Sequence, residues 1–353
     1  MPTGKRKGET TKEVNLKKTN IEEGIAPISY YASKFESIRL GFYLNFPEEF
    51  VRFYEFCSKL DESKPLGKIN HCLTDVLEAF HSIAQVRLVG PFELLHESRS
   101  GRIEPGQFTL CYRYFHDPPE LVTILTGPGQ LHFGCFRDDP NEVPSAIVRS
   151  DPSIQGSLTL YAPNLFVAIK TLLTDKPNSE FILKKLENFA SVHNISLSMT
   201  GTEFRERRSK CVCPTLNTIG LHVKLREGGV GYRPLSLSNQ KLQSLLQAVT
   251  NVKSKEAQLS KLEPIDVLIT CSQFACDEGD YGQSLELGLS MLAFQPKGLS
   301  LEKCNVFNSR IKHLLTVGYE LAGRPEFADV IQKHMTARNV DPPTFELDNT
   351  STP

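Results

Sequence analysis

The chain has 353 residues, enough for two domains of ordinary size or one large domain. Its 40 Lys and Arg balance 41 Asp and Glu, which excludes a global electrostatic preference for nucleic acid, membrane or an acidic substrate. No apolar run approaches the roughly 18 to 20 residues that cross a bilayer, and the basic amino terminus lacks the apolar core of a signal peptide. We therefore expect a soluble intracellular protein.

Residues 1–36 are predicted to form a disordered basic tail, because the first part of this range carries many Lys and Arg and almost nothing apolar to bury. Gly-Lys-Arg-Lys at 4–7 could be a nuclear import signal, a weak nucleic-acid contact or a solubilising segment. We favour the import signal and expect a nuclear protein. At the other end, the polar residues 341–353 are predicted to form a second disordered tail.

Residues 37–150 are predicted to form an amino-terminal α+β domain. Asn45, Pro47 and two acids favour the start of a helix over about 47–60, because a capping side chain, an early proline and acidic residues stabilise a helix amino terminus. The spacing of apolar residues predicts a second helix, and alternation predicts short strands that form a small antiparallel sheet. These further elements are the helix 73–83 and the strands 87–89, 107–115, 121–125 and 131–136.

Residues 151–340 are predicted to form a mainly helical carboxyl-terminal domain, since apolar residues recur three and four apart along most of it. The expected helices cover 164–173, 181–192, 239–249, 264–275, 281–292, 299–321 and 326–335. Two extended runs, 195–199 and 221–225, interrupt them. The whole chain is therefore predicted to be an α+β protein with a predominantly helical carboxyl half.

Three carboxylates, Asp277, Glu278 and Asp280, lie within four residues between two predicted helices. Carboxylates this close repel one another, so one of them could accept a proton near neutral pH and serve as a general base. The alternative is a solvated turn whose carboxylates cap a helix.

Signatures of self-contained enzymes are missing from the sequence. The glycines near 127–129 and 228–231 complete no phosphate-binding pattern, and there is neither a nucleophile elbow nor a metalloprotease helix. The nine cysteines are odd in number and scattered, which favours reduced thiols. Cys211 and Cys213 form one close pair without nearby histidines, a poor zinc site, so we expect no metal site.

Several motifs occur together, in order along the chain. Val-Gly-Tyr-Arg stands at 230–233, and Tyr-Gly-Gln-Ser-Leu-Glu-Leu-Gly follows the acidic turn at 281–288. With these motifs the sequence resembles the histone PARylation factor family, the accessory proteins of DNA-damage-activated poly(ADP-ribose) polymerases. The likeness covers roughly residues 40–337 and extends through 112–120, 133–138 and 164–170.

The resemblance implies a protein that is not an enzyme alone but completes one. A family member docks on the polymerase catalytic domain, where the polymerase and not this chain binds NAD, and supplies a catalytic glutamate that falls here on Glu278. The joint site then modifies serine on histones and other proteins. Asp277, Tyr232 and Arg233 match the family's docking residues. The resemblance further implies location at damaged chromatin in the nucleus, and we expect a free monomer without membrane or sequence-specific nucleic-acid contacts.

The chemistry explains why a serine acceptor needs help. A carboxylate acceptor is already ionised at pH 7, whereas a serine hydroxyl keeps its proton and is a weak nucleophile without a base. A nearby carboxylate can accept this proton and also stabilise cationic character on the ribose. We expect Asp280 and Glu286 to give structural or electrostatic support.

Two departures from the family pattern stand out. Pro234 follows Tyr232-Arg233, where the family has an acidic residue, and it restricts Arg233 to extended geometry, which puts the docking affinity in doubt. Residues 64–86 are longer than in vertebrate members. Separately, four basic residues could hold an acidic peptide or nucleic acid, or could form a solvated loop. These are Arg205, Arg207, Arg208 and Lys210.

Two other classes of protein remain open on the sequence. One is a self-sufficient hydrolase or glycosidase that uses the 277–280 carboxylates within a single chain. The other is a chromatin adaptor that has no chemical role. Turnover by the isolated protein separates the first from an accessory factor, and a Glu278→Gln substitution separates the second.

Overall fold

The computed structural model describes residues 28–61, 76–95, 105–151 and 156–342. At its centre is a five-stranded antiparallel sheet whose strands follow one another in chain order. The strands are β1 Arg87–Leu88, β2 Leu121–Thr126, β3 His132–Phe136, β4 Ala146–Ser150 and β5 Leu158–Ala162. Because only neighbouring strands pair, β1 and β5 form the two edges of the sheet.

Helices of the amino-terminal part, together with two that follow the sheet, build the first core. They are α1 Ile28–Phe42, α2 Glu48–Asp61, η1 Val76–Glu78, α3 His81–Ala84, α4 Pro91–Leu95, α5 Leu165–Leu173 and α6 Glu180–Val192. Aromatic side chains fill this core: Phe53, for example, is fully buried and meets Phe166 of α5 edge-on, with ring centroids 5.2 Å apart.

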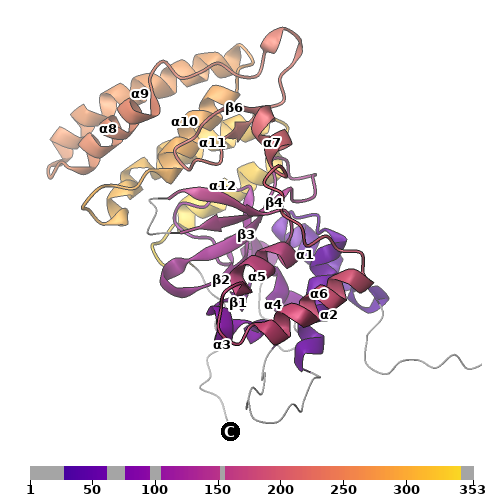
Figure 1. The fold of residues 1–353 in the computed structure, drawn as a ribbon. Helices are drawn as coiled ribbons and strands as arrows, with labels where there is room; N and C mark the ends of the chain where they lie inside the picture. Colours follow the sequence, from indigo (N-terminus) through magenta and orange to yellow (C-terminus); the bar gives the residue numbers. More distant parts are fainter. Residues whose placement is uncertain (1–27, 62–75, 96–104, 152–155, 343–353) are drawn as a thin grey trace, which may run out of the picture.

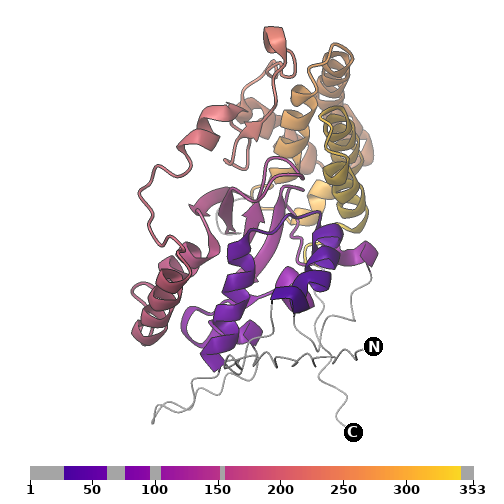
Figure 2. The ribbon, with the colours of Figure 1, turned by 90° about the vertical axis from the view of Figure 1, so that its right-hand side faces the viewer.

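The helices of the carboxyl-terminal part follow, and most of them build the second core. They are α7 Arg205–Lys210, η5 Glu227–Gly229, α8 Asn239–Thr250, α9 Lys255–Asp277, α10 Gly282–Ala293, η6 Leu301–Phe307, α11 Asn308–Leu321 and α12 Pro325–Ala337. A two-stranded sheet, β6 Cys211–Cys213 with β7 Leu221–His222, joins them. Every residue of α10 is buried, as expected of a helix that packs on all sides. The sheet lies between the two groups of helices (Figures 1 and 2).

The predicted α+β class is confirmed, with an antiparallel sheet in the amino-terminal half and a helical carboxyl-terminal half. The predicted boundary at residue 150 falls inside the sheet, because β4 and β5 pair across it. The helix α1 begins at Ile28, inside the range 1–36 predicted to be a tail. The helix is part of the fold because its apolar residues Ile38 and Phe42 are buried in the first core. Residues 1–27 and the tail from 343 lie outside the described residues.

The strand predicted over 107–115 is wrong. A 3₁₀ helix, η2 Pro105–Leu110, and turns occupy this range. Arg113 is the physical reason, since its buried guanidinium donates to the carbonyls of Thr109, Pro118 and Leu121 and fixes a compact turn. The aromatic residues of the range are all buried in the core. Their spacing therefore does not indicate the alternating faces of a β-strand. Residues 195–199, predicted to be extended, belong to no paired strand.

The helix α9 begins at Lys255, nine residues before the predicted start at Pro264. Ser254 caps it, because its hydroxyl accepts from the Ala257 N–H at 3.2 Å. Pro264 is exposed and lies between the buried residues Leu262 and Ile265. Packing of these two buried neighbours stabilises the helix, although Pro264 has no backbone N–H to donate.

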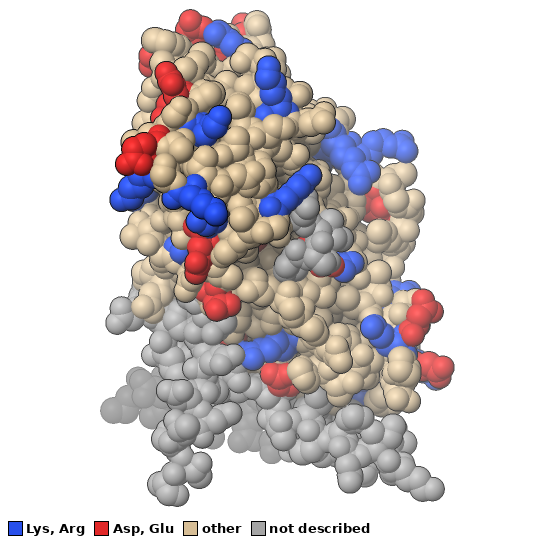
Figure 3. Space-filling view, turned by 90° about the vertical axis from the view of Figure 1, so that its left-hand side faces the viewer, with Lys and Arg blue, Asp and Glu red and all other residues tan. Residues whose placement is uncertain are grey.

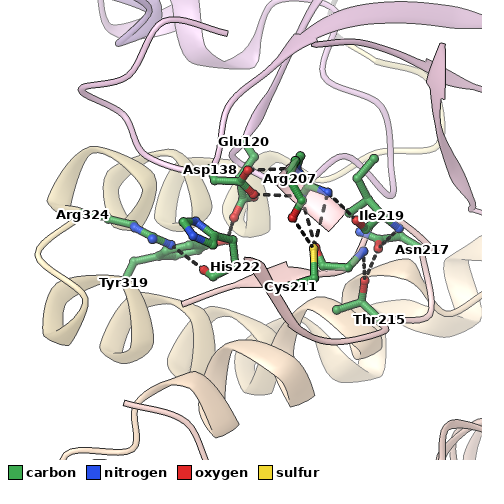
Figure 4. A network of polar contacts seen from close by, with 11 residues as sticks. Glu120, Asp138, Arg207, Cys211, Thr215, Asn217, Ile219, His222, Tyr319 and Arg324 are labelled. Atoms are coloured by element: carbon green, nitrogen blue, oxygen red, sulfur yellow. Dashed lines mark hydrogen bonds and ion pairs between the residues drawn. The ribbon is translucent and has the colours of Figure 1, made fainter. Parts of the chain in front are cut away.

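A polar seam joins the sheet to the helical half (Figure 4). Asp138, just after β3, accepts two hydrogen bonds of 2.8 Å from the buried Arg207 of α7. Beside it, the Tyr319 hydroxyl of α11 donates to Glu120 at 2.7 Å. Lys224, which follows β7, pairs with Asp139 at 2.9 Å. The segment after β7 is therefore fixed to the sheet.

Candidate functional site

Glu278 caps the carboxyl end of α9. The helix ends in a Schellman motif, in which the Asp280 N–H donates to the Ala275 carbonyl at 2.7 Å and the Gly279 N–H to the Cys276 carbonyl at 2.9 Å. This turn needs Gly279, whose φ is +94°, because side chains rarely adopt that conformation. Residues 278–280 thus form a tight corner at the end of α9, and 58% of the Glu278 side chain is exposed there.

Arg233 connects the two carboxylates of the corner. Its Nη2 contacts Glu278 Oε2 and lies 3.1 Å from Asp280 Oδ2. The pKa of Arg233 is raised above its usual value, first by the hydrogen bond to Glu278. Glu278 Oε1 has no hydrogen-bond partner among the residues that the structure describes. One oxygen of Glu278 is therefore fixed and the other faces solvent.

Asp280 ties the corner to the glycine-rich segment before Tyr232. Its Oδ1 accepts from the Gly231 N–H at 3.0 Å, and the Gly282 N–H donates to the Gly231 carbonyl at 2.8 Å. Asp280 is less exposed than Glu278, with 13% of its side chain accessible. Asp280 therefore holds both Arg233 and the backbone that carries it.

Tyr232 points in the opposite direction, into the protein. Its hydroxyl donates to Glu286 Oε2 at 3.0 Å, and the Leu235 N–H donates to the same oxygen at 3.3 Å. Glu286 lies on α10, and burial raises the pKa of its carboxyl. Burial also raises the pKa of the neighbouring Cys213 thiol to about 12. Tyr232 and Glu286 thus anchor the strand-like segment whose next residue, Arg233, reaches the surface.

An exposed apolar stripe runs along α9 toward the corner. Leu259, Val267 and Phe274 are 68%, 57% and 63% exposed. Asp277, the last residue of α9, is exposed, and its side chain makes no ion pair or hydrogen bond with another described residue. The sequence interpretation missed the exposure of this stripe, although its spacing of seven and eight residues along a helix was visible.

In the described ranges, no group of three or more His, Cys, Asp or Glu could hold a metal ion, and the eight cysteines there are unpaired. None of the described helices is both long and apolar enough to span a membrane. Lys and Arg are interspersed with Asp and Glu on the face shown in Figure 3, in line with the balanced formal charge.

The structure brings together five of the six residues singled out in the sequence and leaves Asp277 on the adjoining surface. Arg233, Glu278 and Asp280 form the exposed corner, and Tyr232 and Glu286 support it from inside. Gly279 and Gly231 complete the corner and were not singled out, although a glycine just after a helix signals such a turn. Pro234 accepts a hydrogen bond from Gln283 at 3.0 Å through its carbonyl.

The fold and the site define an α+β protein with a solvent-facing cluster of carboxylates and arginine at a helix end. A family model for Histone PARylation factor 1 matches residues 32–338. The chain is 30% identical to Histone PARylation factor 1 of Mus musculus over 342 residues, which cover 93% of this chain and 92% of that protein. It is 28% identical to the Bos taurus protein, with 94% and 93% covered. The chain belongs to the Histone PARylation factor 1 family.

Proposed function

We propose that this chain is an accessory factor of a poly(ADP-ribose) polymerase and supplies Glu278 as the general base that directs ADP-ribosylation to serine on histones. The observation that carries the proposal is the geometry of Glu278: its side chain is more than half exposed, and Arg233 contacts only one of its carboxylate oxygens. A base that works alone within one chain is expected in a concave pocket. A carboxylate that is positioned by an arginine but exposed to solvent suits an active site that a second protein completes.

The surface around Glu278 supports docking. Phe274 lies one helical turn before Glu278 and is 63% exposed, and Val230 beside Gly279 is 37% exposed. Exposed apolar side chains beside charged ones are typical of protein interfaces. Asp277 and Arg233 lie at the edge of this surface and are proposed to contact the polymerase catalytic domain.

In the proposed mechanism, NAD bound by the polymerase supplies the ribose carbon from which nicotinamide leaves with its bonding electrons. Glu278 Oε1 accepts the serine hydroxyl proton while the serine oxygen bonds to that carbon. Arg233 keeps the carboxylate in position through Oε2, and Asp280 keeps Arg233 in position. Such assistance typically contributes on the order of 10²- to 10⁴-fold in rate.

The test is transfer of ADP-ribose to a serine-containing histone peptide by the polymerase with NAD and broken DNA. Wild-type protein is expected to promote transfer only when the polymerase is present. Glu278→Gln is expected to bind the polymerase normally and fail in transfer. Arg233→Ala is expected to fail chiefly through weakened binding, measured separately by titration of the polymerase catalytic domain.

Two outcomes would replace the proposal. Turnover of NAD or of a glycoside by the isolated chain would identify a self-sufficient enzyme. Unchanged serine transfer with Glu278→Gln, together with intact histone binding, would identify an adaptor.

A nuclear location at sites of DNA damage is part of the same proposal. It is supported by the family's name, which refers to histones, and by the basic sequence at 4–7, which lies outside the described residues. A fluorescent fusion should accumulate in the nucleus, and deletion of residues 1–10 should reduce this accumulation. Equal distribution of both forms between nucleus and cytoplasm would contradict it.

A further inference from the structure

A groove of about 480 Å³ lies between the edge of the five-stranded sheet and the two-stranded sheet. Strand β5 contributes one wall and β6 the other, and the segment 214–220 lies between them. Leu160 and Val212 are half-buried in the walls, and Ile219 is buried. The volume falls within the range of roughly 300–1,000 Å³ that is typical of binding sites.

The outer backbone edge of strand β5, which lines this groove, is occupied at Leu158 and open at Leu160. The outward N–H of Leu158 donates to the Asn217 carbonyl at 2.7 Å, and its carbonyl accepts from Thr218 at 3.1 Å. Backbone groups of alternate residues point the same way along a strand, so the N–H and carbonyl of Leu160 also point outward. Within the described ranges no backbone partner pairs with this side of Leu160. The edge is therefore open for one more extended strand.

One free guanidinium group lines this groove, and a second lies three residues before it on the same helix. Arg205 and Arg208 lie three residues apart on α7, both are exposed, and Arg208 lines the groove. Neither has an ion pair or hydrogen bond through its side chain with another described residue. The other basic groups of α7 are already paired, Arg207 with Asp138 and Lys210 with Glu206. The positive charge at the groove is therefore available to a partner.

We infer that this groove binds an acidic peptide segment of another protein in extended conformation. The peptide backbone pairs with the outward edge of Leu160, alternate apolar side chains rest on the groove floor, and acidic side chains meet Arg205 and Arg208. This is the strand-addition mode of peptide recognition, in which backbone hydrogen bonds give affinity and flanking side chains give specificity. The inference does not depend on the role proposed for Glu278.

The lining of the groove favours a peptide over a nucleic acid. Single-stranded nucleic acids are held by aromatic side chains that stack on bases along a continuous basic track. The groove is lined by aliphatic, threonine, cysteine and proline side chains with a single arginine. The strand edge matches the backbone of a peptide, and Arg208 in the lining, with Arg205 on the same helix, matches acidic side chains.

The first experiment uses an eight-residue labelled peptide of alternating valine and glutamate, titrated against the full chain by fluorescence anisotropy. The same peptide with lysine in place of glutamate is expected to bind at least tenfold more weakly. N-methylation of alternate residues removes the donors from one edge of the peptide only. One of the two N-methylated sets is expected to abolish binding and the other to leave it largely intact.

The second experiment changes the protein. Arg205→Glu combined with Arg208→Glu is expected to weaken the glutamate peptide by roughly tenfold or more, because charge-assisted hydrogen bonds are lost. Lys241→Glu combined with Lys261→Glu makes the same change in net charge on exposed helix surfaces and is expected to leave binding unchanged. Bound peptide should also slow amide exchange at Leu160 and not in β2.

Three results would overturn the inference. The arginine variant could bind the glutamate peptide as tightly as wild type. Both N-methylated sets could bind equally well, which would exclude strand pairing. An oligothymidine of eight nucleotides could displace the peptide at equal concentration, which would assign the groove to nucleic acid.

Discussion

Arg233 and Glu278 lie 45 residues apart in the sequence and in contact in the fold. Nothing in spacing or periodicity predicts this contact; the sequence joined the two residues only through a family resemblance. The close carboxylates of the acidic turn were visible, but the arginine that lies against two of them was not. The roles of Glu278, Asp277, Tyr232 and Arg233 stay predictions until they are tested in the complex.

Gly279 determines how Glu278 is presented. In Gly279→Ala, the added Cβ would lie 3.1 Å from Val230 Cγ1, in a backbone conformation with φ of +94°. We expect a loss of about 1–2 kcal/mol in the free energy of unfolding, measured by urea denaturation. Gly298→Ala is the control, since φ is +69° there but nothing lies within 4 Å of the added Cβ. Equal losses in the two variants would show that the contact with Val230 is unimportant.

Tyr232 stabilises the buried Glu286 carboxylate. Tyr232→Phe removes one of the donors to this carboxylate, and we expect a loss of about 1–2 kcal/mol in the free energy of unfolding at pH 7. Burial already raises the pKa of Glu286, and the lost hydrogen bond should raise it further. Protonation of the carboxyl removes the charge that the hydroxyl stabilised, so the loss should shrink as pH falls from 7 toward 5. A loss that is constant with pH would contradict this assignment.

At the level of elements, long periodic helices were predictable and short irregular segments were not. The helices α5, α6, α8, α10 and α12 begin and end close to their predicted bounds, because an apolar face and capping residues are local signals. The range 107–115 misled the prediction because the buried Arg113 donates to the Thr109 carbonyl and fixes a turn, which the alternation of apolar residues does not reveal. β4 and β5 were not predicted, and their pairing is what places the edge of the sheet.

The seam between sheet and helices supports a prediction at this scale. Asp138→Asn leaves the buried Arg207 without a carboxylate, and we expect a loss of about 3 kcal/mol in the free energy of unfolding. The matched control is Asp266→Asn, which breaks a two-bond pair with Arg310 whose aspartate is 49% exposed. For this control we expect a loss of less than about 1 kcal/mol in the free energy of unfolding. Similar losses in denaturant titrations of the two variants would show that burial of the seam contributes little.

Across the whole molecule, buried basic groups join the two halves. Arg338, which follows α12, donates to the carbonyls of Phe115 and Leu292, and burial lowers its pKa to about 9. His116 accompanies it, with Nδ1 2.8 Å from the Leu292 carbonyl. The sequence predicted two cores but could not show which segments join them, because such contacts link residues more than 100 positions apart.

His116 should make the fold sensitive to acid. Burial first, and then the charge of Arg338, lower its pKa from 6.5 to about 4. Between these two pKa values the folded protein keeps the ring neutral while the unfolded chain takes up a proton. The free energy of unfolding is therefore unaffected by this ring above pH 6.5 and decreases as the pH drops toward 4. In that window wild type should lose up to about 1.4 kcal/mol per pH unit more than His116→Gln. Parallel stability curves for the two proteins would exclude this role.

The most direct test of the role of Glu278 compares two acceptors in one reaction. Peptides that differ only in a serine or a glutamate acceptor are modified by the polymerase with wild type or Glu278→Gln. A base matters only for the acceptor that must lose a proton, so the serine rate should fall by on the order of 10²- to 10⁴-fold and the glutamate rate should stay nearly unchanged. An equal fall for both acceptors, or none for serine, would contradict a general base at Glu278.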